Sequence, residues 1–348
     1  MLTTASELRA AIDEHGTWAE VSRVTGIPCT TLKSRAARHK VTKRRHRPVE
    51  DQVEYAVSLP ARTDRTVRKP PRAKRATKTS PVLAALVADQ HCPHHDPGLY
   101  ACWIEWCRAN QPDRIIGLGD IVNLATPSRH RKNLHHRHND TPREGLQAAH
   151  DWWRSTLDAA GPKTSAEQIA GNHDLRIPIA ILERVPDIYD LQRPGEEHPW
   201  HDLEYLLGLD KLGVKYHRPL GEYHDTELFL CDSFSVAHGA KAGPYGGAPR
   251  DATRHEGSRA TGHAHKASLT LTVRYRQGEA IQHVAVSVPT MARRDLGYHP
   301  TPDSHQGFAT LTMHNDSTWN AELALYDDRR RQLWWRDQTY TAPTPQAA

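Results

Sequence analysis

Five short blocks of metal-ligand residue types are spread over the middle of this 348-residue chain. The first four blocks each follow or end a run rich in apolar residues, at a point where a strand would end. Carboxylate, carboxamide and imidazole groups suit zinc, manganese or iron better than ions that prefer thiolates. The blocks are D-Q-H at 89–91, G-D at 119–120, G-N-H-D at 171–174, A-H-G at 237–239 and G-H-A-H at 262–265.

The first three blocks follow an alternation of strand and helix patterns. "PVLAALVADQH", "RIIGLGD" and "EQIAGNHD" are typical of buried strands, and the intervening residues 98–111 and 144–161 carry apolar side chains at helical spacing. This alternation predicts parallel strands joined by crossover helices. The carboxyl ends of such strands form the usual site of an open α/β sheet, so we expect the blocks to converge. The second half of the chain is strand-rich.

The blocks, in this order over residues 82 to about 290, resemble those of the calcineurin-like metallophosphoesterases. The resemblance implies an α/β fold, a four-layer α/β/β/α sandwich of two mixed sheets. It also implies phosphoester hydrolysis at two divalent metals, by attack of a hydroxide held between them. Manganese is the expected metal, with zinc, iron or nickel as alternatives. The implied ligands are Asp89, His91 and His265 for the first metal, Asn172, His238 and His263 for the second, and Asp120 as the bridge.

The resemblance gives His173 a catalytic role, either stabilising the transition state or protonating the leaving oxygen. Several family members carry an aspartate that polarises this histidine, whereas this chain has Asn123, whose amide orients an imidazole without stabilising its charged form. Asp174 is expected to cap the following helix. Arg129 and Arg176 each come shortly after a metal block and are candidates for gripping a substrate phosphate.

Positive charge is concentrated near the N-terminus. Residues 33–78 contain sixteen Lys or Arg and four Asp or Glu, so that subtracting their +12 from the net charge of +5 leaves −7 for the rest. The proline-containing segment 41–80 is expected to be a linker. It is either simply solvated or holds the phosphates of a nucleic acid. The basic, histidine-rich segment 127–140 is likewise either a solvated loop or a wall of the site.

The sequence pattern of residues 1–40 predicts a small all-α module. A turn at Gly26 separates a short helix that ends with Val21 and Val24 from a second helix that begins near Cys29. This pattern resembles a helix-turn-helix, so nucleic acid, DNA foremost, is the expected partner, and a dimer would fit paired half-sites. A helical hairpin that docks elsewhere is the alternative. The expected nucleic-acid contacts are Lys33, Arg35, Arg38, Lys43, Arg44 and Arg45.

The remaining features bound the class of protein. No stretch approaches the roughly 20 apolar residues that span a bilayer, and the first residues lack the pattern of a signal peptide. The five cysteines form no C-x-x-C motif, which favours free thiols and a cytoplasmic location. We therefore expect a helical module over 1–40, a linker over 41–80, a phosphoesterase domain over 81–340 and a loose tail over 341–348.

Three functions follow from these patterns. The first is a nuclease or other nucleic-acid phosphodiesterase delivered to DNA by the basic N-terminal region. The second is a small-molecule phosphoesterase acting on nucleotides, cyclic nucleotides or phosphoprotein. The third is a DNA-binding regulator with an inactive phosphoesterase body, against which the complete set of ligand residues argues.

Overall fold

The computed structural model of the chain describes residues 4–15, 17–38, 80–125, 141–219, 221–241, 257–276, 278–296, 303–314 and 318–344. The chain divides into two compact units, Met1–Arg68 and Lys69–Ala348. Each unit has a hydrophobic core of its own. The predicted site residues Lys43, Arg44, Arg45 and Arg129, most of the 41–80 linker and the 127–140 segment lie outside the described residues.

The first unit contains three short helices, α1 (Ala5–His15), α2 (Trp18–Thr25) and α3 (Cys29–Arg38). Gly26 ends α2 in the left-handed region with φ 70°, where glycine has no Cβ to clash. The helices bury one shared core of Leu8, Ala11, Ile12, Val21, Leu32 and Ala36. The predicted helical module is therefore present, whereas its use as a DNA-binding helix-turn-helix stays a prediction.

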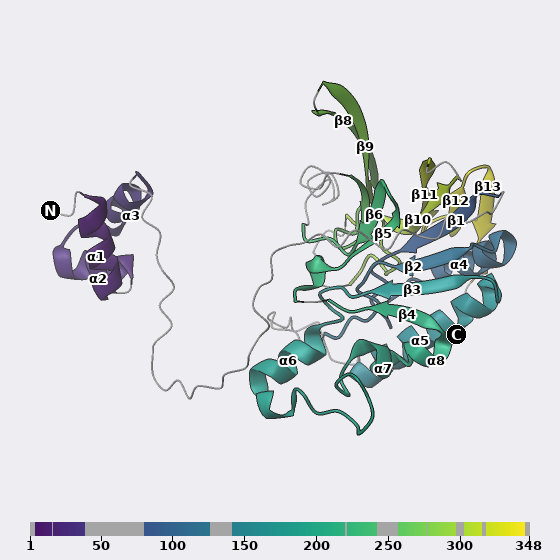
Figure 1. The fold of residues 1–348 in the computed structure, drawn as a ribbon, viewed down its shortest axis with the longest axis horizontal. Helices are drawn as coiled ribbons and strands as arrows, with labels where there is room; N and C mark the ends of the chain where they lie inside the picture. The colour runs from purple at the N-terminus through teal and green to yellow at the C-terminus, as the bar shows by residue number, and fades with distance from the viewer. Residues whose placement is uncertain are drawn as a thin grey trace. The chain divides into compact units, whose positions relative to one another are not determined.

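The second unit is built on an eight-stranded mixed sheet. Its strands β1 to β4 pair in parallel, and β10 joins β1 in the antiparallel sense (Figure 1). In sheet order the strands are β13 (Gln338–Thr341), β12 (Gln332–Trp335), β11 (Trp319–Asp327), β10 (Gln306–Met313), β1 (Val82–Val87), β2 (Arg114–Gly117), β3 (Ser165–Ile169) and β4 (Val214–His217).

A second, five-stranded mixed sheet carries the remaining strands. Strands β6, β7 and β9 are parallel, and β5 and β8 pair with them in the antiparallel sense. The β8–β9 hairpin extends beyond the body of the sheets (Figure 1), and Leu271, Val273 and Tyr275 on β8 are exposed. In sheet order the strands are β5 (Glu227–Cys231), β6 (Phe234–Ala237), β7 (Ser258–Thr261), β9 (Glu279–Ser287) and β8 (Ser268–Arg276).

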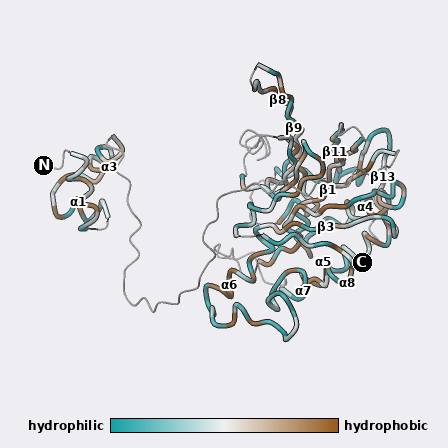
Figure 2. The backbone as a smooth tube through the Cα atoms, in the orientation of Figure 1, coloured by the Kyte–Doolittle hydropathy of each residue, from teal (hydrophilic) through white to brown (hydrophobic). Residues whose placement is uncertain are grey.

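Strand β1 shows how the layers are joined, because its side chains alternate between two cores. Ala85 and Val87 belong to the core that contains helices α4 (Pro97–Asn110) and α5 (Pro142–Ala160). Ala84 and Leu86 belong to the core shared with the five-stranded sheet. Figure 2 shows largely apolar colouring along the central strand β1, as expected for a strand covered on both faces. The expected α/β fold of two mixed sheets is thus confirmed.

Helices α4 and α5 pack on the large sheet through tryptophan side chains. Trp103, Trp106, Trp152 and Trp153 are all fully buried, and the rings of Trp103 and Trp106 stack with centroids 5.4 Å apart. Asp96 and Thr141 cap the two helices by accepting backbone N–H groups of the first turn, which fixes where each helix begins. Within the described part of the chain, no helix is long and apolar enough to cross a membrane.

The segment between β3 and β5 was not anticipated in any detail. It contains helices α6 (Arg176–Arg184), α7 (Leu203–Leu207) and α8 (Leu209–Leu212), strand β4, and the short 3₁₀ turns η1 (Pro186–Ile188) and η2 (Tyr223–Asp225).

The expectation of a loose tail from residue 341 was wrong for its first two residues. Thr341 pairs in β13, and Ala342 is buried and donates its N–H to the carbonyl of Arg331 at 2.9 Å.

Candidate metal centre

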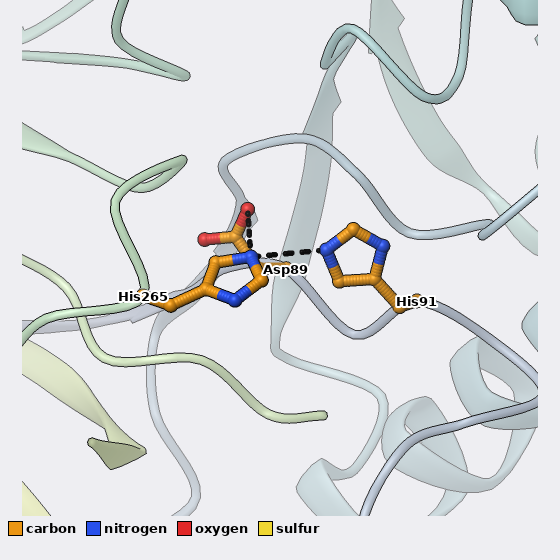
Figure 3. A group of neighbouring side chains, drawn as sticks. All are labelled: Asp89, His91 and His265. Carbon is orange, nitrogen blue, oxygen red and sulfur yellow. Dashed lines mark hydrogen bonds and ion pairs between the residues drawn. The ribbon is translucent and has the colours of Figure 1, made fainter. Parts of the chain in front are cut away.

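A first group of ligand atoms comes from the loops after β1 and β7. Atoms of Asp89, His91 and His265 lie within 4.8 Å of one another. The Nε2 atom of His265 lies 3.1 Å from Nε2 of His91 and 3.5 Å from Oδ1 of Asp89 (Figure 3). Among the described residues, Oδ1 of the fully buried Asp89 has no hydrogen-bond partner. A buried carboxylate oxygen aimed at two imidazole nitrogens fits a divalent cation.

A second group is formed by Asp120, His238 and His263, whose ligand atoms also lie within 4.8 Å of one another. The Oδ1 atom of Asn172 joins it, 3.0 Å from Nε2 of His238. The fully buried His238 donates its Nδ1–H to the carbonyl of Leu118 at 2.8 Å. That bond orients the ring and directs Nε2 into the group, as backbone carbonyls do for metal-binding histidines.

Asp120 connects the two groups. Its Oδ2 atom lies 3.5 Å from Nε2 of His238 in the second group and 4.0 Å from Nε2 of His91 in the first. A single carboxylate with metal-ligand atoms on both sides is the arrangement that a two-metal site requires. The structure therefore brings together all seven residues predicted as ligands, from five separate loops.

Most of the predicted ligand residues adopt strained backbone conformations. Five of them have positive φ angles in the left-handed region, which is uncommon for residues other than glycine. Such strain persists only where the surrounding structure imposes it, and it gathers at functional sites. The five are Asp89, His91, Asp120, His263 and His265, with φ between 47° and 66°.

Two glycines allow the loops to approach closely. A Cβ atom on Gly119 would lie 2.6 Å from Nδ1 of His238 and 2.7 Å from the backbone nitrogen of Gly171. Neither neighbour is the free end of a flexible side chain, so both loops would have to move. Glycine in the G-D and G-N-H-D blocks is therefore explained by the contact between the loops.

Asp174 has a different role from the one expected. Helix α6 begins after Leu175 and has no side-chain cap, so Asp174 does not cap it. Instead its buried carboxylate accepts backbone N–H groups from Asp120 at 2.8 Å, Gly171 at 2.8 Å and Val122 at 3.2 Å. Asp174 thus ties the loop after β2 to the loop after β3, which the sequence motif alone did not reveal.

His173 is held by main-chain and arginine contacts. Its Nδ1–H donates to the backbone carbonyl of Asn123 at 2.8 Å, so the main chain of Asn123 makes the contact that was expected of its side-chain amide. The guanidinium of Arg176 lies 2.8 Å from Nε2 of His173 and 2.7 Å from the same carbonyl. Arg176, predicted to grip a phosphate, is therefore at the centre, although it is already engaged with His173.

The electrostatics prepare most of these residues for metal binding. Burial raises the pKa of Asp120, but the nearby His238 outweighs this effect and holds the pKa well below its usual range. Burial, reinforced by His173 and His265, lowers the pKa of His91 well below its usual range. Burial also lowers the pKa of His238, but Asp120 outweighs this effect and raises it to about 9. Binding of a cation at His238 must therefore release a proton.

Tyr223 was not predicted as a residue of the site. Its ring in η2 packs edge-on against His238, with centroids 5.5 Å apart, and lies 6.1 Å from the ring of His263. A tyrosine in an unpatterned segment carries no spacing signal, so only the fold could place it beside the second group.

No family model matches the chain, and no curated protein matches it. Among solved structures, Vacuolar Protein Sorting 29 of Cryptosporidium parvum is 14% identical over 75% of this chain and 99% of its own, with a TM-score of 0.35.

Two further structures show the same degree of likeness. Vps29 of Entamoeba histolytica in complex with zinc is 12% identical over 70% of this chain and 98% of its own, with a TM-score of 0.30. Nuclease MPE of Pseudomonas putida is 16% identical over 69% of this chain and 87% of its own, with a TM-score of 0.27. At these low values, only the geometry of the centre bears on the function of this chain.

Proposed function

We propose that this protein is a phosphodiesterase that depends on two divalent metal ions, with nucleic acid, and DNA in particular, as its substrate. The observation that carries the proposal is Asp120, a buried carboxylate with a group of metal-ligand atoms on each side. The five sequence blocks that resemble calcineurin-like metallophosphoesterases support it, because they supply these same residues.

The residues of the chain fit the metals that this function needs. Asp89, His91 and His265 would hold one ion, Asn172, His238 and His263 the other, and Asp120 both. Bound there, divalent ions would supply Lewis-acid polarisation of the phosphoryl oxygens and of the attacking water. Manganese suits the mixed oxygen and nitrogen donors, and zinc, iron and nickel are the alternatives to test.

The N-terminal region favours nucleic acid over a small phosphoester as the substrate. Within α3, Lys33 is exposed while Leu32 and Ala36 are buried, so one face of the helix forms the core and another meets solvent. Lys33, Arg35 and Arg38 stand on this helix, at the start of the segment that carries a charge of +12. A basic surface of this kind attracts phosphates of a polynucleotide and gives steeply salt-dependent binding.

The proposal is tested with the full-length protein and labelled single- and double-stranded DNA in the presence of Mn²⁺. We expect cleavage that EDTA abolishes and that the D120N variant lacks. A triple variant, K33A/R35A/R38A, should weaken DNA binding and cleavage while hydrolysis of bis-(p-nitrophenyl) phosphate is unchanged. Hydrolysis of the small ester with DNA left intact would instead favour a small-molecule phosphoesterase. Metal-free protein without any hydrolysis would favour the inactive regulator.

A further inference from the structure

The contacts of His173 define its protonation state. Arginine offers only N–H donors, so where the guanidinium of Arg176 meets Nε2 of His173 at 2.8 Å, the imidazole nitrogen must accept. On the other side of the ring, Nδ1 lies 2.8 Å from the carbonyl of Asn123, which can only accept, so Nδ1 must carry the proton. Both ring nitrogens are thereby assigned, and the ring is neutral with its proton on Nδ1.

The same contacts fix Arg176. A carbonyl oxygen has two lone pairs, and that of Asn123 accepts both from Nδ1 of His173 and from Arg176 at 2.7 Å. The three groups therefore form a closed ring of hydrogen bonds. Nε2 of His173 also lies 3.9 Å from Oδ2 of Asp120. The ring of hydrogen bonds thus holds a guanidinium at the imidazole nitrogen that lies near the carboxylate joining the two ligand groups.

We infer that His173 is a positioning residue, which as the neutral Nδ1–H tautomer holds the guanidinium of Arg176 against the substrate phosphate, and that it does not protonate the leaving oxygen. This inference rests on the proposed function. In the hydrolysis, an oxygen of water bonds to phosphorus and the ester P–O bond breaks. The electron pair of that bond stays on the leaving oxygen, which takes a proton from solvent water, while the attacking water gives up one proton to solvent. The fixed charge of Arg176 stabilises the phosphoryl oxygens as negative charge develops on them.

The contact with Arg176 also indicates that His173 is not one of the metal ligands. Its Nε2 atom is near enough to His91 and Asp120 to join a metal-binding group. The cationic guanidinium at that nitrogen occupies its lone pair and would repel a metal ion, so the metal content should not depend on His173.

The decisive variant is H173Q. The side-chain oxygen of glutamine can accept from Arg176 as Nε2 does, but glutamine cannot act as an acid. The substrates are methyl p-nitrophenyl phosphate and methyl phenyl phosphate, which differ only in how much the leaving oxygen needs a proton. We expect H173Q to lower kcat/KM by the same factor, within about threefold, on both esters, because general acid catalysis worth roughly 10²- to 10⁴-fold is not being removed. A much larger loss on the phenyl ester would overturn the inference.

This comparison is insensitive to misfolding, because one sample of protein hydrolyses both esters and the amount of active protein cancels in the ratio. R176K is the matched variant, since a lysine ammonium cannot contact Nε2 and the carbonyl as a planar fork does. It should lose about 10²-fold on both esters alike. A loss below about threefold would contradict the role of Arg176.

A measurement without turnover tests the inference separately from the proposed function. Two-dimensional ¹H–¹⁵N NMR of the imidazoles in EDTA-treated protein, with His173 assigned by its absence in H173Q, should show a protonated Nδ1 and a bare Nε2. A proton on Nε2 would refute the tautomer. If wild-type protein with Mn²⁺ hydrolyses neither ester, the proposed function fails, while the NMR result still decides the tautomer. Loss of one bound Mn²⁺ per chain in H173Q would show that His173 is a ligand and overturn the inference.

Discussion

The backbone N–H of Asp120 donates to Oδ2 of Asp174 at 2.8 Å, so the shared ligand of the candidate centre is held by a residue of the neighbouring loop. The two residues lie 54 positions apart in the chain. Asp174 is itself no part of either ligand group. It determines instead where the main chain that carries Asp120 lies.

Replacing Asp174 should therefore affect both folding and metal binding. D174A leaves buried N–H groups of Asp120, Gly171 and Val122 without their acceptor, at a cost on the order of 3 kcal/mol in the free energy of unfolding. The affinity for Mn²⁺ should fall about 10- to 100-fold, as for other residues that orient ligands. Urea unfolding and metal titration measure the two effects. D174N, which keeps one carbonyl oxygen, is the control and should be less affected in both.

Adding a single methyl group at Gly119 should push its loop away from the loops that carry His238 and Gly171. G119A places a Cβ atom 2.6 Å from Nδ1 of His238, where it disturbs the hydrogen bond to Leu118 that orients this ring. We expect a loss of Mn²⁺ affinity of at least about tenfold. G161A, at another glycine with positive φ but with open space around it, is the matched control. Equal Mn²⁺ affinity in G119A and wild type would contradict this account of the contact.

The contacts of Glu167 should make the free energy of unfolding depend on pH, independently of metal binding. Burial raises its pKa, but hydrogen bonds from His217 and Arg114 outweigh burial and lower the pKa to about 2. Because the folded pKa is below the ordinary value of 4.5, the stabilisation is present above pH 4.5 and is lost as the pH falls toward 2. The loss should amount to roughly 1 to 3 kcal/mol.

Urea unfolding of wild type and E167Q at several pH values between 3 and 7 checks this expectation. The stability difference between the two proteins should shrink steadily below pH 4.5. A difference that stays constant down to pH 3 would show that the pair of contacts to Arg114 and His217 does not stabilise the charged form.

The contribution of the N-terminal helix should appear in the salt dependence of DNA binding. In K33A/R35A/R38A, the slope of log affinity against log salt should become shallower by about 0.7 to 0.9 for every phosphate contact removed. Fluorescence anisotropy with labelled DNA at several salt concentrations measures this slope. The α2 variant R23A, which removes a charge that Glu20 already pairs with, is the control and should leave the slope unchanged. An identical slope in the triple variant and wild type would show that α3 is not part of the DNA-binding surface.

The sequence was sufficient for features that local pattern determines. Strands β1 and β2 are short, largely apolar and covered on both faces, and helices α4 and α5 carry apolar stripes, so their order could be read directly. Strand β3 could be predicted from its place in this alternation, although it contains the polar Glu167 and Gln168. The residues of the candidate centre could also be grouped, because each stands in a short motif at a strand end and parallel strands bring such ends together.

Features that depend on contacts between distant segments could not be predicted. The carboxylate of Asp174 bonds to main-chain groups of the loop after β2, and no spacing in the sequence encodes such a bond. The same holds for the carbonyl of Asn123 beside His173, where the side chain carried no information about the main chain. Ala342 was expected in a loose tail because its neighbours are small and polar. Thr341 instead pairs with Gln332 of β12, and Ala342 is buried in the core that also contains residues of α4 and α5.

The most direct test of the proposed centre is hydrolysis of bis-(p-nitrophenyl) phosphate by the full-length protein with Mn²⁺, compared between wild type and D120N. Metal content is determined for the same samples. We predict two Mn²⁺ per wild-type chain, turnover that requires them, and loss of both metal and turnover in D120N with the fold retained by circular dichroism. Turnover by D120N equal to that of wild type, or wild-type protein that binds Mn²⁺ and hydrolyses no phosphodiester, would contradict the account.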